Sequence, residues 1–287
     1  MDIKSDSYRS VVNTYIPAMC YDSTGNPTRD CIGGWFYKVK TKSAEKNASF
    51  AKSHNWNYVL LSSNVKSNDA RERLINNVLA FRKQNIAVHI MCLEDTYYID
   101  HPTSAYDEIS SILKFVNENN LDIQGIHIDC EPHGRADWKN ASIEERKRIF
   151  KDYLKVIEYG RKAINEFRPN TVYSGAVAWW YPQKVTSNEL QYGRGYDLVK
   201  KTRFDFIIPM IYGGAGGTID IVVKRSDDYI NDGVATVVGI SVEDYEYKKF
   251  NDVMTKIKKI RNGKANSEFF NGFSIYANHL YPDWEKY

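Results

Sequence analysis

Short apolar segments recur along the chain, and each is followed by a longer segment that mixes polar and apolar residues. The apolar segments are rich in β-branched and aromatic residues and carry Gly or Pro at their edges, a pattern typical of buried strands. There are eight of them, at residues 32–39, 58–62, 86–93, 123–130, 172–180, 204–212, 235–242 and 270–276. The intervening segments predict helices. The clearest begins after Ser142, where Glu145 completes a capping box, and ends before Pro169.

Eight strands that alternate with helices over about 250 residues predict a (β/α)8 barrel, the TIM-barrel class of α/β fold. A doubly wound open sheet is the alternative. It usually has fewer strands for this length, and no GxGxxG motif follows the first apolar segment. No linker or low-complexity stretch interrupts the chain. We therefore expect a single domain, with residues 1–30 as a short N-terminal extension and residues 31–287 as the barrel.

The composition excludes several classes of protein. The chain of 287 residues is 43% hydrophobic and 26% charged, values that fit a globular protein and not a disordered chain or a fibre. No apolar run reaches eighteen residues, so we expect no membrane span. The net charge of +3 is too small to predict nucleic-acid binding. We also expect the protein to be a monomer. The aromatic content of 14% is high, and part of it is available to line a site.

The cysteines leave the cellular compartment open. None of the four lies in a CxxC pair, which argues against a zinc ribbon or a thioredoxin motif. Cys92 and Cys130 lie within apolar segments and are interpreted as buried thiols. Cys20 and Cys31 flank a turn-rich segment and could be bridged in an oxidising compartment. The N-terminus has no signal-peptide pattern. We expect an extracytoplasmic protein whose signal has been removed, with a cytoplasmic one as the alternative.

In a (β/α)8 barrel, the chemistry lies where the strands end at the C-terminal face. The candidates there are Glu94, Asp95, His127, Asp129, Glu131, Trp179, Trp180, Tyr212, Glu243, Asp244, Asn278 and His279. The fourth segment is the richest, because alternation places Gly125, His127, Asp129 and Glu131 on one face. Burying three ionisable groups without a use would be costly. Two neighbouring carboxylates repel, which raises the pKa of one of them and suits it to proton donation.

The seventh segment ends near Glu243, roughly opposite the fourth segment across the barrel. Glu131 and Glu243 could therefore face each other over a sugar, as the two carboxylates of a retaining glycosidase do. The alternative for Glu243 is a carboxylate that caps the following helix.

Aromatic residues follow several strand ends and could stack on sugar rings. The candidates for substrate binding are His127, Trp179, Trp180, Tyr97, Tyr276 and Asn278, and alternation lets only one of the two tryptophans face the pocket. The glycines of residues 213–217 match no phosphate-binding motif and favour a mobile loop. His127, Asp129 and Glu131 are not a sufficient metal-ligand set, so we expect neither a metal nor a cofactor.

The fourth segment, from Gly125 to Glu131, resembles the DGxDxDxE strand of family 18 chitinases and endo-N-acetylglucosaminidases. Residues 209–212 resemble the MxYD segment of that family, and residues 272–276 fall where it has its last barrel strand. The resemblance implies that Glu131 is the general acid, that Asp129 orients the substrate N-acetyl group and that Tyr212 steadies the reacting amide. The chain departs from the family pattern at Gln124, His127 and Gly213.

A second resemblance competes with the first. Glu131, followed by Pro132, is similar to the Asn-Glu-Pro motif of clan A retaining glycosidases, with Cys130 in place of the Asn. That resemblance implies that Glu131 is the acid/base and that Glu243 is the nucleophile.

Together these observations predict a glycoside hydrolase that acts on an oligosaccharide or polysaccharide. In the leading hypothesis Glu131 is the acid/base, Glu243 is the nucleophile, and Asp129 and His127 hold Glu131 in position. In the second hypothesis the substrate's own acetamido group is the nucleophile, supported by Asp129 and Tyr212. A sugar-binding barrel without catalysis is a third hypothesis. Phosphosugar metabolism through residues 213–217 is the weakest.

Overall fold

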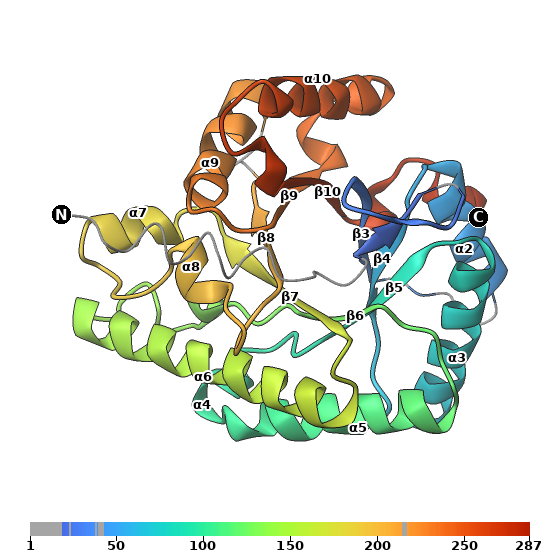
Figure 1. Cartoon of the computed structure of the whole chain (residues 1–287), viewed down its shortest axis with the longest axis horizontal. Coiled ribbons are helices and arrows are strands. Elements are labelled where there is room, and N and C mark those ends of the chain that lie inside the picture. Colours follow the sequence, from blue (N-terminus) through green and yellow to red (C-terminus); the bar gives the residue numbers. More distant parts are fainter. Residues whose placement is uncertain (1–18, 23, 38, 40–42, 214–216) are drawn as a thin grey trace.

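The computed structural model describes residues 19–22, 24–37, 39, 43–213 and 217–287. Eight parallel strands close into a barrel in the order β10-β3-β4-β5-β6-β7-β8-β9, with helices outside them (Figure 1). The strands are β3 (Cys31–Phe36), β4 (Tyr58–Ser62), β5 (Ala87–Cys92), β6 (Gly125–Ile128), β7 (Val172–Ala178), β8 (Phe206–Met210), β9 (Thr236–Ser241) and β10 (Phe270–Tyr276). The predicted (β/α)8 barrel is confirmed.

Each predicted apolar segment overlaps one strand. The largest difference is at the end of β3, which stops at Phe36 instead of residue 39, and two further C-terminal strand ends bear on the site. The expected strand over residues 123–130 is shorter, because β6 leaves the sheet after Ile128. Only the Asp129 amide still bonds to the neighbouring strand, at 3.2 Å from the Cys92 carbonyl oxygen. The expected strand over residues 172–180 also ends early, because Trp179 and Trp180 form a turn. Both differences lie at the face where we expected the site.

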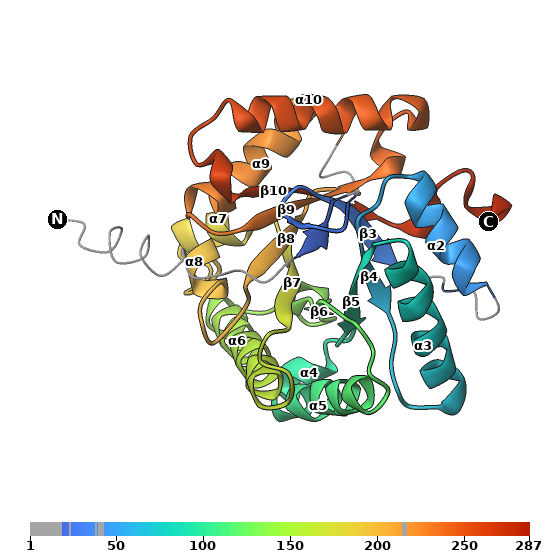
Figure 2. The same cartoon turned by 45° about the vertical axis from the view of Figure 1, so that its right-hand side comes forward.

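The helices surround the strands, and α5 and α6 lie on the side opposite α9 and α10 in both views (Figures 1 and 2). The N-cap at Ser142 is confirmed, since the Ser142 hydroxyl accepts a hydrogen bond from the Glu145 amide, which is one of the two bonds of the predicted capping box. The helices are α2 (Ala44–Ser53), α3 (Asn68–Lys83), α4 (Tyr97–Asp100), α5 (Thr103–Glu118), α6 (Ile143–Phe167), α7 (Tyr181–Thr186), α8 (Gly195–Leu198), α9 (Ile219–Asn231) and α10 (Phe250–Asn262).

Two apolar cores hold the fold together. The outer core lies between the strands and the helices and includes the side chains of Ile126, Ile128 and Cys130. The inner core fills the barrel with large side chains such as Trp35, Tyr58 and Phe206. The alternation predicted for β6 therefore holds, with apolar side chains facing the helices and polar ones facing the barrel axis. Cys92 and Cys130 are buried free thiols, as expected.

The N-terminal end of the barrel is closed by the described part of the expected extension. Residues 19–22 and 24–30 belong to a hairpin of β1 (Cys20–Tyr21) and β2 (Pro27–Thr28), while residues 1–18 and 23 lie outside the described residues. A disulfide joins Cys20 to Cys31 at the start of β3, with a Cα–Cα distance of 5.8 Å. The backbone oxygen of Met19 lies 2.7 Å from Nε2 of the buried His89. The hairpin is thus fixed both covalently and by a hydrogen bond inside the barrel.

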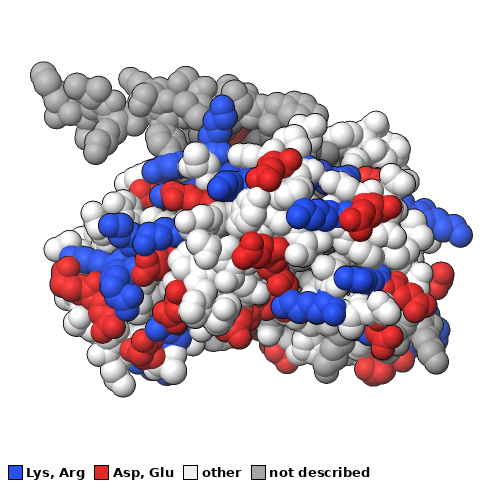
Figure 3. All heavy atoms as spheres, turned by 90° about the horizontal axis from the view of Figure 1, so that it is seen from below, with Lys and Arg blue, Asp and Glu red and all other residues white. Residues whose placement is uncertain are grey.

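The surface carries charges of both signs. On the face seen in Figure 3, acidic and basic side chains are interspersed, without a large area of one sign. Within the described ranges, no helix has the length and apolar character needed to cross a membrane.

Candidate active site

A pocket of about 350 Å³ opens at the C-terminal ends of the strands, where this fold places its chemistry. Its lining combines one carboxylate with a histidine and several aromatic side chains: Tyr37, Glu131, His133, Ala178, Trp179, Trp180, Met210, Tyr212 and Tyr276. These residues follow five different strands. The pocket therefore exists only because the barrel closes.

Glu131 is the carboxylate of this pocket, and a two-residue relay holds it. It lies just beyond β6, and its side chain is 33% exposed, so a ligand can reach it. Its Oε2 is 3.1 Å from Nε2 of His133. Nδ1 of His133 is 2.8 Å from the hydroxyl of the buried Tyr181. With the Tyr181 hydroxyl donating to Nδ1, Nε2 carries the proton and donates it toward Glu131.

Asp129 lies deeper than Glu131 on the same side of β6. Its Oδ2 accepts a hydrogen bond of 2.7 Å from the Tyr37 hydroxyl, and its buried Oδ1 bonds to no described residue. Burial raises the pKa of Asp129 to about 7, with the charges of Glu131 and Glu94 adding to the effect and the Tyr37 hydrogen bond opposing it. The pKa of one of the two neighbouring carboxyls is thus raised, as the sequence predicted, but burial contributes more to the shift than the repulsion between the carboxylates.

Two tyrosines stack beside the carboxyls. Tyr212 and Tyr276 are nearly parallel, with ring centroids 4.7 Å apart and an angle of 11° between them. Both rings pack edge-to-face with Trp35, which is buried beside them. Burial, together with the charges of Asp129 and Glu131, holds the pKa of Tyr212 well above its usual range. Its hydroxyl therefore stays protonated and can donate a hydrogen bond.

Both Trp179 and Trp180 line the pocket, whereas the sequence predicted only one of them. Strand alternation does not apply to them, because β7 ends at Ala178 and the two residues form a turn before α7. Trp180 contacts the edge of His133, with ring centroids 5.4 Å apart. The Arg225 guanidinium lies 3.9 Å from the Trp179 ring centroid.

Five predicted site residues are not among the residues that line the pocket: Asp129, described above, and the four that follow. His127 is fully buried at 2.9 Å from the Ser174 hydroxyl, and burial lowers its pKa to about 3, which keeps it neutral. Asn278 is also buried, and its Oδ1 accepts a hydrogen bond from the backbone amide of Tyr37. Tyr97 is 52% exposed and packs on His101. Glu243 lies in a short 3-10 turn after β9, where its amide donates to the Ser241 hydroxyl.

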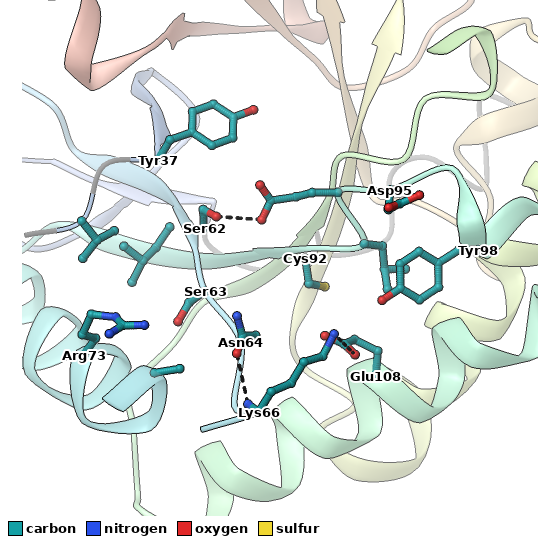
Figure 4. Close-up of a pocket in the computed structure, with 15 residues that line it drawn as sticks. Tyr37, Ser62, Ser63, Asn64, Lys66, Arg73, Cys92, Asp95, Tyr98 and Glu108 are labelled. Atoms are coloured by element: carbon teal, nitrogen blue, oxygen red, sulfur yellow. Dashed lines mark hydrogen bonds and ion pairs between the residues drawn. The ribbon is translucent and has the colours of Figure 1, made fainter. Parts of the chain in front are cut away.

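A second pocket of about 500 Å³ adjoins the first, because Tyr37 lines both (Figure 4). It lies at the ends of β4 and β5, between α3 and α5. Its lining is largely polar: Tyr37, Val39, Leu61, Ser62, Ser63, Asn64, Lys66, Ala70, Arg73, Cys92, Leu93, Glu94, Asp95, Tyr98 and Glu108. The predicted candidates Glu94 and Asp95 therefore belong to this pocket.

Sequence reasoning missed two residues that build the site. Tyr37 follows β3 directly, but the predicted strand over residues 32–39 concealed it. His133 is two residues beyond Glu131, and that spacing was a usable signal. Tyr181 was available as one of the aromatic residues after a strand end, but its contact with His133 could not be predicted, because that contact joins two different strand ends.

No metal site is evident. Within the described part of the chain, no group of three or more His, Cys, Asp or Glu side chains is arranged to hold a metal ion. Residues 214–216 of the predicted glycine-rich loop lie outside the described residues.

The comparisons with known proteins identify the fold. No known protein-family profile matches the sequence, and no curated protein matches it. Solved structures do match. A GH18 chitinase from Pseudoalteromonas aurantia superposes with a TM-score of 0.59 at 14% identity, over 89% of this chain and 97% of that chain. A fungal β-1,4-galactanase gives a TM-score of 0.55 at 11% identity, over 89% of this chain and 83% of that chain. GH10 from Paenibacillus barcinonensis gives 0.54 at 9% identity, over 94% and 89%.

These neighbours are glycoside hydrolases of several families, and the chain shares their (β/α)8 barrel. At such low identity the likeness concerns the fold alone. The chemistry has to be argued from the pocket itself.

Proposed function

We propose that this barrel is a glycoside hydrolase in which Glu131 is the general acid/base. The proposal rests on one observation above all. Glu131 and Tyr212 line an aromatic-walled pocket at the C-terminal end of the barrel, and the buried Asp129 interacts electrostatically with both of them, while Glu243 is not among the residues that line the pocket. We therefore favour the mechanism in which the substrate supplies its own nucleophile, an acetamido group, over the one in which Glu243 attacks. The GH18 chitinase among the fold neighbours is compatible with this choice.

In the proposed reaction, Glu131 protonates the glycosidic oxygen while the acetamido carbonyl oxygen attacks the anomeric carbon from the opposite face. The bond to the leaving sugar breaks, and the leaving sugar keeps the proton. Asp129 accepts the acetamido N–H and stabilises the positive charge that develops on the cyclic intermediate, and Tyr212 donates a hydrogen bond to the acetamido oxygen and orients it. Water, deprotonated by Glu131, then opens the cyclic intermediate at the anomeric carbon. The substrate therefore carries an N-acetylhexosamine.

The test is hydrolysis of N-acetylhexosamine oligomers by the wild type and by Glu131→Gln. The amide cannot donate the proton, so we expect turnover to fall by about 10²–10⁴-fold. Retention of more than about a tenth of the wild-type rate would exclude Glu131 as the acid. Binding of oligomers by the wild type without any product would instead favour a sugar-binding barrel.

Glu243→Gln is the control that separates the two mechanisms. With the acetamido group as nucleophile, we expect its turnover to stay within about three-fold of the wild type, as for a residue outside the chemistry. A loss as large as that of Glu131→Gln would restore Glu243 as nucleophile and would widen the substrate to sugars without an acetamido group.

We further propose that the enzyme acts as a monomer outside the cytoplasm. The Cys20–Cys31 disulfide supports an oxidising compartment.

A further inference from the structure

The pocket between α3 and α5 is not used by the proposed chemistry, although it is the larger of the two. Glu131 does not line it, yet it adjoins the pocket of Glu131, because Tyr37 lines both. The Tyr37 hydroxyl is anchored on Asp129, and its backbone amide is anchored on Asn278. The shared wall is thus fixed in place between the two pockets.

The charges of this pocket nearly balance. Lys66 and Glu108 form an ion pair at 3.1 Å, and they lie together in Figure 4. Asp95 is occupied at one oxygen by the Tyr97 amide, at 2.7 Å. Arg73 extends from α3 toward the pocket and makes no ion pair with a described residue (Figure 4). An anionic ligand would meet three carboxylates, and a cationic ligand would meet Lys66 and Arg73.

The same groups are well suited to hydroxyls. The Ser62 hydroxyl donates to Oε1 of Glu94 at 2.7 Å, which leaves the second oxygen of that carboxylate as an acceptor. Arg73 supplies charged donors, Asn64 supplies an amide, and Tyr98 supplies an aromatic ring on the wall. Hydrogen bonds in which one partner is charged are the strong ones, and a polyol satisfies donors and acceptors together. A volume of about 500 Å³ is within the usual range for small-ligand pockets.

We propose that this pocket is a second saccharide-binding site that takes an uncharged, hydroxyl-rich sugar unit. That unit belongs to the same oligosaccharide whose scissile bond lies at Glu131. This inference rests on the proposed function and deepens it, because it makes the substrate an oligosaccharide that passes over Tyr37. Affinity then depends on chain length. A sugar that fills only the pocket of Glu131 gains nothing from Arg73 or Glu94.

The experiment measures binding separately from turnover. In the Glu131→Gln background, calorimetry follows β-1,4-linked oligomers of N-acetylglucosamine, glucose, mannose and xylose, from one to six units. We expect at least one series to gain roughly ten-fold or more in affinity once it is long enough to reach the second pocket. Adding Arg73→Gln or Glu94→Gln removes that gain and leaves the binding of the short oligomers unchanged.

Matched controls and a charged probe sharpen the result. Arg29→Gln, on the hairpin at the closed end, and Glu118→Gln, at the far end of α5, remove the same charges from exposed positions and should leave the gain intact. Oligogalacturonate of equal length should bind more weakly than the best neutral series. The proposal is overturned if no series shows the gain, if the gain survives both pocket variants, or if the acidic oligomer binds best. A length-dependent gain without turnover by the wild type would support the second site and reject the proposed hydrolysis.

Discussion

The two ends of the barrel use similar residues in opposite ways. At the closed end, His89 lies entirely inside the barrel, bonds the Met19 carbonyl oxygen and is kept neutral by burial, which lowers its pKa to about 4. At the open end, His133 is partly exposed and bonds Glu131 at the pocket. The inward-facing side chains of β6 and of the residues that follow it pass from the buried interior to the solvent-exposed end of the barrel. Gly125 packs against His89 at one end, and Glu131 is open to solvent at the other.

The difference separates residues that hold the barrel from residues available for chemistry. A polar side chain that is buried and hydrogen-bonded, as His89 is at Nε2, contributes to stability. A carboxyl that is partly exposed to solvent can instead exchange a proton with a ligand. We therefore expect changes at the closed end to lower stability and changes at the open end to lower turnover. The predictions below test this division, beginning with the largest expected effect.

Gly125→Ala tests how tightly the closed end is packed. A Cβ at this position would lie 2.1 Å from Nδ1 of His89, whose ring is held by its bond to Met19. We expect the free energy of unfolding to fall by about 3 kcal/mol, the upper part of the range for overpacked cores. Urea denaturation measures it.

Gly263→Ala is the matched control for Gly125→Ala. An added Cβ there meets its nearest atom at 3.5 Å, an ordinary contact distance. Its stability should stay within about 0.5 kcal/mol of the wild type. Equal stability of the two variants would show that the His89 region is looser than the structure implies.

Removal of the disulfide is the next test of the closed end. The bridge closes a loop between residues separated by 11 positions, and the chain-entropy relation gives about 3 kcal/mol for a loop of this size. Cys20→Ser with Cys31→Ser should lose about that much stability while keeping the wild-type turnover at low temperature. Reductant should destabilise the wild type and leave the double variant unchanged. A loss of turnover in the folded double variant would contradict the division between the two ends.

The fold was predictable from the sequence to a greater degree than the site. Apolar segments buried on both faces identify strands by composition alone, and β4 and β10 match the predicted bounds end to end. The alternation predicted along β6 holds for the strand itself, and Asp129 and Glu131, just beyond its end, still lie close enough for their charges to interact. The limits appear where a strand ends, because side-chain direction then depends on the local turn, as at Trp179 and Trp180. Contacts between different strand ends, such as His133 with Tyr181, have no signature along the chain.

Asp129→Asn sharpens the comparison at the open end. The pKa of this carboxyl is raised from 3.8 to about 7 in the folded protein, so between pH 4 and 7 the folded chain holds a proton that the unfolded chain has released. Wild-type stability from this group is therefore present at low pH and is lost as pH rises through 7. Asn at this position does not titrate, so the variant does not lose this stability as the pH rises. In the proposed mechanism, the same substitution lowers turnover by about 100-fold.

The measurements are urea denaturation from pH 4 to 8 and kcat at pH 6. Glu131, Glu94 and Tyr37 also face this carboxyl, so the informative quantity is the difference between variant and wild type at each pH. That difference should shift in favour of Asn as the pH rises. If the difference in stability between variant and wild type does not change from pH 4 to 8, Asp129 is ionised throughout this range. A raised pKa of Asp129 in the folded protein would then be excluded.

Tyr181→Phe is the smallest change and tests whether the open end needs orientation as well as charge. It removes the hydroxyl 2.8 Å from Nδ1 of His133, so the imidazole is free to change tautomer and to turn away from Glu131. We expect kcat to fall by about five-fold, the equivalent of one ordinary hydrogen bond, while KM is unchanged because no ligand contact is lost. Tyr153→Phe is the matched control, since that hydroxyl is buried and bonds to no described residue. If both variants lower kcat equally, the effect belongs to packing of the buried rings. If only Tyr181→Phe does so, the relay from Tyr181 through His133 holds the Glu131 carboxyl in its working orientation.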